Sequence, residues 1–361
     1  MSIDSILLDV LPRGEGYENL YFQTNPAYVN SPIHIPKSTS KPDTVKVRHF
    51  YSLLHNNVII LGLEVFVYLQ IYENHTDKYI YVSKCDTTGL EKLPFKMNAV
   101  LEPVLKYMID YNAYKVKPRQ EKSHAPPANP STYFRLKKLT SQLPEAYPSL
   151  KYYNDLPPKE PVVNYRSLPA LRTTKLYVFT RPAKEYLFPN SSANPNKHLI
   201  SGSALLHWWL KIIDRITGGW QRKLLVPGLD SRTFIKRYEN WEDGHIFEAT
   251  EEGSAVNAIP IFPDDPKGRF LEQLVVENRI SKMLISRFMM ELSYRQEFLG
   301  DTVGIIGCFG ANAANTAGDD QPVNLISIRE YKDFINNVKL IDFTNVDDVT
   351  NFIADYKSSL E

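Results

Sequence analysis

The feature that most constrains the fold of this chain is a run of β-forming residues between Val45 and Asp86. Two short polar breaks interrupt the run, Asn56-Asn57 and residues 73–77 (ENHTD). Asparagine-rich breaks between alternating apolar segments are typical of tight turns between antiparallel strands. The pattern therefore predicts three consecutive strands in an antiparallel meander, around which the rest of the chain has to pack.

Three other segments carry apolar residues at helical spacing. Residues 97–110 contain Pro103 in their middle, which predicts a kinked or late-starting helix. A second helix is expected to begin after the capping residue Ser201 and to end at Gly218-Gly219. A third, longer helix is expected to begin at Asp264-Asp265-Pro266 and to continue to Gly300. Its predicted core stripe consists of Phe270, Leu274, Leu284, Phe288 and Leu292.

Residues 115–169 are dense in proline and cannot form a central strand or a long helix. We expect this segment to be a long inserted surface loop, partly disordered, after which a further strand begins at Lys175 and ends at Thr180. Strands and helices interleaved around one sheet indicate a mixed α/β (α+β) fold with a central mixed β-sheet surrounded by helices. The prediction is a single domain over residues 1–361.

Composition and missing motifs exclude several classes of function. The 42 basic and 41 acidic residues leave a formal charge of +1, so no global field attracts DNA and direct DNA binding is not expected. Cys85 and Cys308 are too few for a disulfide framework or a four-cysteine zinc module. The motifs of P-loop enzymes, zinc proteases and α/β-hydrolases are absent from the sequence, as is an apolar run of ~18 residues. We expect an intracellular protein without a metal or a membrane span.

Residues 18–23 (ENLYFQ) spell the recognition site of a viral protease that is often placed in expression vectors. No tag precedes it, and Thr24 stands where that protease usually finds Gly or Ser. We interpret the match as a coincidence, with an engineered scar as the alternative.

The densest local group of charged residues is the segment 259–270 (IPIFPDDPKGRF). Because Asp264 and Asp265 are adjacent on one turn, they cannot flank a scissile bond as the separated carboxylates of a glycosidase do. They either cap the helix or, if one is desolvated, attract a substrate ammonium group and assist proton transfer. Lys267 is close enough in sequence to pair with either.

Three further segments each have a structural and a functional interpretation. Trp208 and Trp209 are either both core residues or one of them lines a groove. Residues 84–89 (KCDTTG) form either a plain turn or a loop that presents backbone N–H groups to a ligand. The six acidic residues within 239–253 make either a solvated loop or a surface for a basic partner.

Six motifs, in chain order, are Phe50–Leu53 (FYSL), 63–68 (LEVFVY), 82–89 (VSKCDTTG), 176–189 (LYVFTRPAKEYLFP), 197–215 (KHLISGSALLHWWLKIIDR) and 259–270. Together they resemble the fungal histone H3 lysine acetyltransferases that act with histone chaperones, which are relatives in fold of the CREB-binding-protein acetyltransferases. The resemblance covers nearly the whole chain. It implies a central sheet wrapped by helices, with acetyl-coenzyme A in a deep cleft.

Carried over motif by motif, the resemblance implies that acetyl-coenzyme A contacts Cys85, Asp86, Thr87, Pro94, Phe95, Lys96, Met97, Asn98, Phe179, Ala183, His198, Leu199, Ile200 and Trp208. Cys85 replaces a small residue that is common in relatives. The resemblance also implies an acetyl-transfer end formed by Tyr186, Trp209, Asp264 and Asp265, with Lys267 as an autoacetylated lysine. We hypothesise that Asp265 holds the substrate ammonium group and assists proton loss, while Trp209 and Tyr186 exclude water.

The same resemblance implies a nuclear enzyme that acetylates histone H3, in the core and the N-terminal tail, during replication-coupled nucleosome assembly and in genome stability. Histone chaperones of the anti-silencing and nucleosome-assembly-protein families would present H3 with H4. The basic tail segments typical of the family do not follow Glu361, which predicts weaker nuclear import or chaperone affinity. The alternatives are a non-catalytic histone-chaperone adaptor that retains the fold and an acyltransferase for a small amine.

Overall fold

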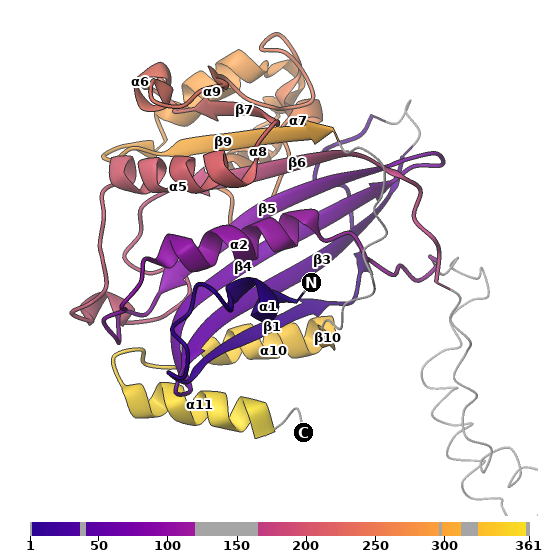
Figure 1. Cartoon of the computed structure of the whole chain (residues 1–361). Coiled ribbons are helices and arrows are strands. Elements are labelled where there is room, and N and C mark those ends of the chain that lie inside the picture. Colours follow the sequence, from indigo (N-terminus) through magenta and orange to yellow (C-terminus); the bar gives the residue numbers. More distant parts are fainter. Residues whose placement is uncertain (1, 37–40, 120–164, 296–297, 312–323, 359–361) are drawn as a thin grey trace, which may run out of the picture. The chain divides into compact units, whose positions relative to one another are not determined.

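The computed structural model describes residues 2–36, 41–119, 165–295, 298–311 and 324–358 (Figure 1). By its internal contacts the chain divides into two units, residues 1–114 with 168–361 and residues 115–167. Of the second unit only the two ends are described, where Val116 and Arg166 form an antiparallel bridge. The predicted insertion at 115–169 therefore lies almost entirely outside the described residues.

A mixed sheet of ten strands runs through the described part of the first unit, in the order β10-β1-β3-β4-β5-β6-β9-β7-β8, with β2 paired to β3. The strands are β1 (Tyr17–Thr24), β2 (Ala27–Tyr28), β3 (Asp43–His55), β4 (Val58–Ile71), β5 (Thr76–Thr87), β6 (Leu171–Thr180), β7 (Gln221–Leu225), β8 (Trp241–Asp243), β9 (Gly304–Ala311) and β10 (Asn324–Ile326). The pairs β1–β10, β5–β6 and β7–β8 are parallel, and the other pairs are antiparallel.

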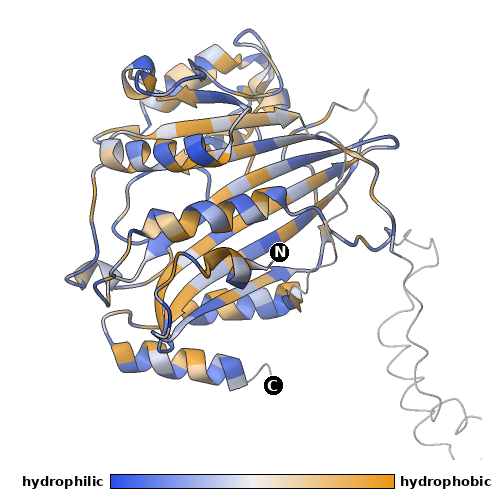
Figure 2. Cartoon of the chain, viewed as in Figure 1, coloured by the Kyte–Doolittle hydropathy of each residue, from blue (hydrophilic) through white to orange (hydrophobic). Residues whose placement is uncertain are grey.

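The predicted antiparallel meander is confirmed as β3, β4 and β5. Asn56 and Asn57 both have positive φ, 49° and 66°, as the two central residues of a type I′ hairpin turn require. Every residue of β4 is buried, so this strand lies at the centre of the core. Figure 2 shows hydrophobic stretches along the central strands, as burial on both faces demands. The strand predicted to start at Lys175 is also confirmed as β6, although it begins earlier, at Leu171.

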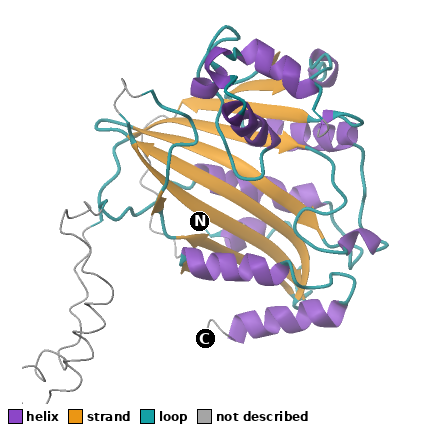
Figure 3. Cartoon of the chain, turned by 180° about the vertical axis from the view of Figure 1, so that it is seen from behind, coloured by secondary structure: helices purple, strands orange, loops and turns teal. Residues whose placement is uncertain are grey.

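Helices cover both faces of the sheet. Figure 1 shows α1 (Ile3–Leu7), α2 (Met97–Asp110) and α5 (Gly202–Ile216) in front of the strands, and α2 contacts α5. On the opposite face, seen in Figure 3, one aromatic-rich core joins the sheet to α7 (Ala255–Ala258), α8 (Pro266–Val276) and α9 (Ile285–Ser293). A second core there joins it to α10 (Ile328–Val338) and α11 (Val346–Ser358). Shorter elements are η1 (Ser191–Ala193), α6 (Arg232–Ile235) and η2 (Ile280–Lys282).

Two of the three predicted helices have the expected ends. The helix α5 is capped by the Ser201 side chain, which accepts a hydrogen bond from the backbone N–H of Ala204, and it ends before Gly218. The helix α2 spans Met97–Asp110 with Pro103 inside it, so of the two alternatives, a kinked or a late-starting helix, the late start is excluded. Among the described residues, no helix is long and apolar enough to cross a membrane.

The long helix predicted from Asp265 to Gly300 is wrong, because the segment folds as α8, η2 and α9. Asn278 adopts positive φ (54°) just beyond α8, a conformation that ends helices. Leu284 then forms a β-bridge with Ser254 instead of continuing a helix, and its side chain is 37% exposed. The other predicted stripe residues, Phe270, Leu274, Phe288 and Leu292, are buried as expected.

The segment that matches a protease site is strand β1, paired along Tyr17–Gln23 with β3 and at its end with β10. Phe22 is 1% exposed and packs against Phe50 and Phe334 in the core. The segment is thus an integral part of the sheet, in agreement with the interpretation of the match as a coincidence.

Candidate active site

The site begins where two parallel neighbouring strands separate. Strands β5 and β6 pair as far as Val82 and Val178, and beyond this point β5 continues to Thr87 along β4 alone. The register between β4 and β5 shifts after Glu64, which leaves Ser83 as an extra residue in β5. Because such a bulge bends its strand, it turns the end of β5 away from β6. Among the described residues, the edge of β5 from Ser83 to Thr87 therefore has no strand partner on that side.

A cavity of about 820 Å³ opens at this separation, within the size range of ligand sites. Of the predicted site residues, Cys85, Asp86, Thr87, Phe95, Lys96, Met97, Asn98, Phe179, Ala183, Tyr186, His198, Leu199, Ile200, Trp208 and Trp209 line it. The structure does not place Pro94 on the cavity, although its neighbours Leu93 and Phe95 are there. Residues 84–87 are thus the end of strand β5 in the cavity wall, and Gly89 lines the cavity just beyond them, so the segment is neither a plain surface turn nor a loop throughout.

Asp86 organises the wall of this cavity from a buried position. Its Oδ2 accepts backbone N–H groups from Tyr186 and Leu187 at 2.9 Å and from Phe188 at 3.3 Å. Its Oδ1 forms an ion pair with the Lys197 ammonium group at 2.7 Å, and both side chains are almost fully buried. Both oxygens are therefore engaged by protein groups, so Asp86 holds the segment 186–188 against β5 and has no free oxygen for a ligand.

Trp208 and Trp209 both line the cavity from α5, with their rings 5.2 Å apart in an edge-on arrangement. Trp209 is 5% exposed and Trp208 is half-buried. Both tryptophans therefore line the cavity and Trp209 is a core residue as well, so the structure matches neither interpretation alone. The cap at Ser201 and a hydrogen bond from the Gly202 backbone N–H to Asp301 position the start of this helix.

Tyr186 closes a tight turn at the mouth of the cavity. Its hydroxyl group donates a hydrogen bond to the carbonyl oxygen of Arg181 at 2.5 Å and accepts one from the backbone N–H of Ala183 at 2.8 Å. Burial raises the pKa of Tyr186 to about 12, so the phenol is uncharged at neutral pH. Burial also raises the pKa of the Cys85 thiol well above its ordinary value, which keeps this cavity residue protonated and weakly nucleophilic.

Asp264 and Asp265, although adjacent, lie in opposite environments. Asp265 is 1% exposed, caps α8 by accepting the backbone N–H of Lys267, and forms a buried ion pair with the Lys267 ammonium group. Asp264 has positive φ (58°), and its side chain is 70% exposed. Neither aspartate is among the residues that line the cavity. Asp264 contacts Lys84, a cavity-lining residue whose Nζ lies 3.3 Å from the Asp264 Oδ2. Asp265 thus caps the helix, as the first interpretation predicts, and of the two carboxylates it is the one that pairs with Lys267.

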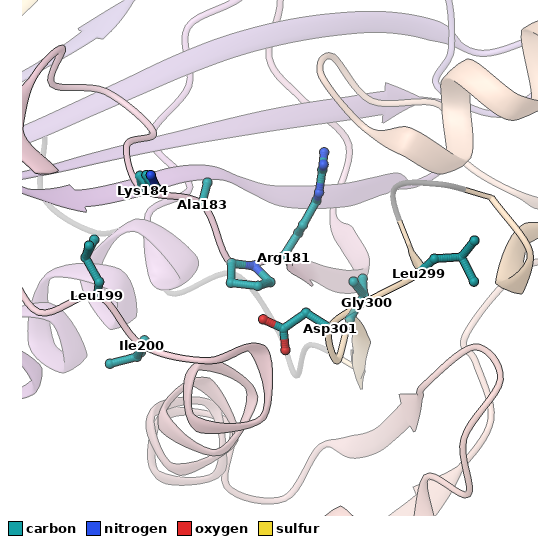
Figure 4. Close-up of a pocket in the computed structure, with 10 residues that line it drawn as sticks. Arg181, Ala183, Lys184, Leu199, Ile200, Leu299, Gly300 and Asp301 are labelled. Atoms are coloured by element: carbon teal, nitrogen blue, oxygen red, sulfur yellow. The ribbon is translucent and has the colours of Figure 1, made fainter.

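A smaller cavity of about 510 Å³ adjoins the large one and shares Arg181, Ala183, Leu199 and Ile200 with it (Figure 4). Its far wall is the segment 299–303, which includes Leu299 and Asp301. The sequence motifs gave no indication of this wall. They also did not single out Lys211 as a cavity residue, although it lies within a matched motif.

Half of the acidic residues in the run at 239–253 are paired with a cation of the protein. Ion pairs join Glu242 to Lys223, Asp243 to Arg232 and Glu248 to Lys175. Glu251 contacts His245, but burial lowers the pKa of His245, so the ring is neutral at neutral pH. All six acidic residues are exposed, as a solvated loop requires. In the part of the chain that the structure describes, no group of three or more His, Cys, Asp or Glu residues is arranged to hold a metal ion.

Comparison with known proteins gives a consistent result. A family model described as the histone acetyltransferase KAT11-type domain matches residues 3–359. The chain is 54% identical over 358 residues to the histone acetyltransferase RTT109 of Candida albicans, an alignment that covers 97% of this chain and 99% of that protein. It is 24% identical over 268 residues to the histone acetyltransferase rtt109 of Schizosaccharomyces pombe, covering 69% of this chain and 56% of that protein. The crystal structure of Rtt109 from Aspergillus fumigatus matches with a TM-score of 0.68 at 20% identity over 99% of this chain and 94% of that one, which shows the shared fold.

Proposed function

This chain belongs to the histone acetyltransferase KAT11-type family and is a lysine acetyltransferase, and we propose that it transfers acetyl from acetyl-coenzyme A to lysine ε-amines of histone H3. The family model spans nearly the whole chain, and the identity to the Candida relative is high over its full length. The choice of cofactor, the histone and the site roles are the proposal.

The observation that carries the proposal is the cavity at the separation of β5 and β6. The pantetheine arm of acetyl-coenzyme A contains two amides, and the unpaired edge of β5 from Ser83 to Thr87 offers backbone donors and acceptors to them. Lys96, Arg181 and Lys211 also line the cavity, and cationic side chains suit the phosphate groups of the cofactor. A long, partly polar ligand with one anionic end fits this lining.

The acceptor amine has to be uncharged when it attacks the thioester, whereas a free lysine has a pKa of ~10.4. We assign the contact with the substrate ammonium group to Asp264, because Asp265 is buried and paired with Lys267. Asp264 is exposed and lies 3.3 Å from the ammonium group of Lys84, a residue that lines the cavity, so an incoming lysine can reach it. Asp265 acts through α8 as a positioning residue, which modifies the expectation that it holds the ammonium group itself.

Trp209 and Tyr186 would enclose the reacting groups and hold the amine close to the thioester carbonyl for direct attack. A covalent intermediate on Cys85 is disfavoured, because its thiol is held in the protonated form by burial. In the direct step the amine nitrogen bonds to the acetyl carbon, the carbon–sulfur bond breaks, and coenzyme A leaves as the thiolate.

Lys267 is proposed as an autoacetylation site, as in the family that the motifs resemble. Its ammonium group is buried against the Asp265 carboxylate, so acetylation would remove the counterion of that carboxylate. An unpaired buried charge costs several kcal/mol, and the start of α8 would therefore have to rearrange or find a new partner for Asp265. The expected consequence is a change in the position of the neighbouring Asp264.

We further propose that the enzyme acts in the nucleus on H3 presented with H4, and that chaperones of the anti-silencing and nucleosome-assembly-protein types stimulate it. The names of the relatives, which are histone acetyltransferases, support a histone substrate. The choice of H3 with H4 and the chaperone families come from the resemblance of the sequence motifs. The alternative of a non-catalytic adaptor that keeps the fold is less favoured, since a pseudoenzyme has no need of the large cavity and the Trp209 and Asp264 groups beside it.

The test is transfer of labelled acetyl from acetyl-coenzyme A to H3–H4, with and without a chaperone, for the wild type and for Asp264→Asn, Asp265→Asn and Trp209→Ala. We expect chaperone-stimulated labelling of H3 that each substitution lowers at least tenfold, while Asp110→Asn at the exposed end of α2 has no effect. The adaptor would instead bind acetyl-coenzyme A or histones without any transfer of label.

A further inference from the structure

The two carboxylates at the proposed acceptor end are both paired with lysines of the chain itself. Lys267 binds Asp265 in a fully buried pair, which the substrate cannot enter without unfolding part of α8. Lys84 pairs with Asp264, and here the geometry differs. The Nζ–Oδ2 distance is 3.3 Å, the Lys84 side chain is 21% exposed and the Asp264 side chain is 70% exposed. An exposed pair of this kind is weak and opens at little cost.

Lys84 is also placed on the cavity proposed to hold acetyl-coenzyme A, next to Cys85 in the unpaired edge of β5. Other cavity lysines lie elsewhere, Lys92 and Lys96 before α2 and Lys211 on α5, and no ion pair joins them to Asp264 in the described residues. Lys197, which also lines the cavity, is locked in its buried pair with Asp86 and a hydrogen bond to Ser191. Lys84 therefore combines three properties: access to the cavity, contact with the acceptor carboxylate and a weak restraint.

We propose that Lys84 is a self-acetylation site that occupies the acceptor position until it is modified. This inference rests on the proposed function, because it requires bound acetyl-coenzyme A. After the Asp264 pair opens and the ammonium group gives its proton to solvent, the Lys84 Nζ attacks the thioester carbonyl carbon. The new C–N bond replaces the C–S bond, and coenzyme A leaves as a thiolate that takes up a proton. The products are acetyl-lysine and free coenzyme A.

The modification has a consequence for substrate binding. An acetylated Lys84 is uncharged and no longer competes for the Asp264 carboxylate, which becomes free for the ammonium group of a substrate lysine. Unmodified Lys84 is in this view an internal competitor of the substrate. Its acetylation activates the enzyme by lowering the KM for the lysine substrate.

The first experiment is incubation of the full chain with ¹³C-labelled acetyl-coenzyme A, followed by peptide mass spectrometry, with an H3 peptide in the same tube. We expect Lys84 to be labelled at a rate that does not depend on enzyme concentration, as an intramolecular reaction requires. Lys106, an exposed lysine paired with Asp110, reports chemical background, and Lys92, Lys96 and Lys211 report non-selective labelling within the cavity. Label on the H3 peptide without label on Lys84 overturns the inference and leaves the proposed function standing.

Equal labelling of Lys84 and the four comparison lysines would also overturn the inference, since it indicates non-selective chemistry. Absence of label on the peptide and on every lysine counts against the proposed function itself. A second measurement compares Lys84→Gln, an uncharged mimic of acetyl-lysine, with Lys84→Arg, which keeps the charge. We expect the KM for the H3 peptide to be about two- to fivefold lower in Lys84→Gln than in Lys84→Arg, the range that an exposed ion pair supplies. An equal or higher KM in Lys84→Gln contradicts the competitor role.

Discussion

The buried carboxylate of Asp86 offers the sharpest test of how this fold builds its cavity. Asp86→Ala removes the acceptor of three backbone N–H groups at 186–188 and leaves the Lys197 ammonium group buried without its counterion. Removal of one partner from a buried pair typically costs about 3–5 kcal/mol, because the other charge remains desolvated. At about 2 cal/mol/K of unfolding entropy per residue, this corresponds to a fall in Tm of about 4–7 °C.

The assay is urea unfolding followed by tryptophan fluorescence, together with calorimetric binding of acetyl-coenzyme A. A double-mutant cycle with Lys197→Met isolates the interaction between Asp86 and Lys197. The loss of stability in the double variant should be about 1–3 kcal/mol smaller than the sum of the losses in the two single variants. The matched control is the exposed pair Lys106–Asp110 on α2, for which the same cycle should give about 0.5 kcal/mol or less. Additive effects of Asp86→Ala and Lys197→Met, within about 0.5 kcal/mol, would refute the assignment of Asp86 as the organiser of the cavity wall.

Three further predictions follow from single elements. Burial lowers the pKa of His49 from 6.5 to about 3. Between these two pH values the unfolded chain therefore binds one proton more than the folded chain, so acidification below pH 6.5 favours unfolding. The free energy of unfolding of the wild type, measured in urea, should fall by up to about 1.4 kcal/mol per pH unit more than that of His49→Gln. Parallel pH profiles of the two proteins would contradict this. Ser201→Ala should lower the free energy of unfolding by about 0.5–2 kcal/mol, because the α5 cap is lost, and it should raise the KM for acetyl-coenzyme A. An unchanged KM would show that the start of α5 does not position the cofactor. The viral protease that recognises residues 18–23 should leave the native chain intact and cleave a peptide of the same sequence, because β1 is paired with β3 over this whole segment and with β10 at its end. Rapid cleavage of the native chain would show that β1 is not a stable strand.

The errors of the sequence-based predictions share a physical origin. The segment 264–300 has a helical pattern throughout, yet Leu284 pairs with Ser254 and Asn278 turns the chain into the left-handed region. Helical periodicity is a local property, and it does not report a competing contact with a residue thirty positions away. The choice between Asp264 and Asp265 as the partner of the substrate ammonium group likewise depends on the fold, because adjacent residues of one motif differ in burial by far more than their sequence suggests.

The sequence by itself determined the local elements and the membership of the site. Apolar alternation and the Asn56-Asn57 turn specify the meander, the Ser201 and Asp265 caps specify helix starts, and the motifs collect most of the cavity-lining residues. Only the tertiary structure decided where β5 leaves β6, that Asp86 holds a segment one hundred residues later, and that Lys84 meets Asp264 across the fold. Propensity, caps and turns depend on neighbouring residues, whereas strand pairing and buried ion pairs depend on segments far apart in sequence, which come together only when the whole core is packed.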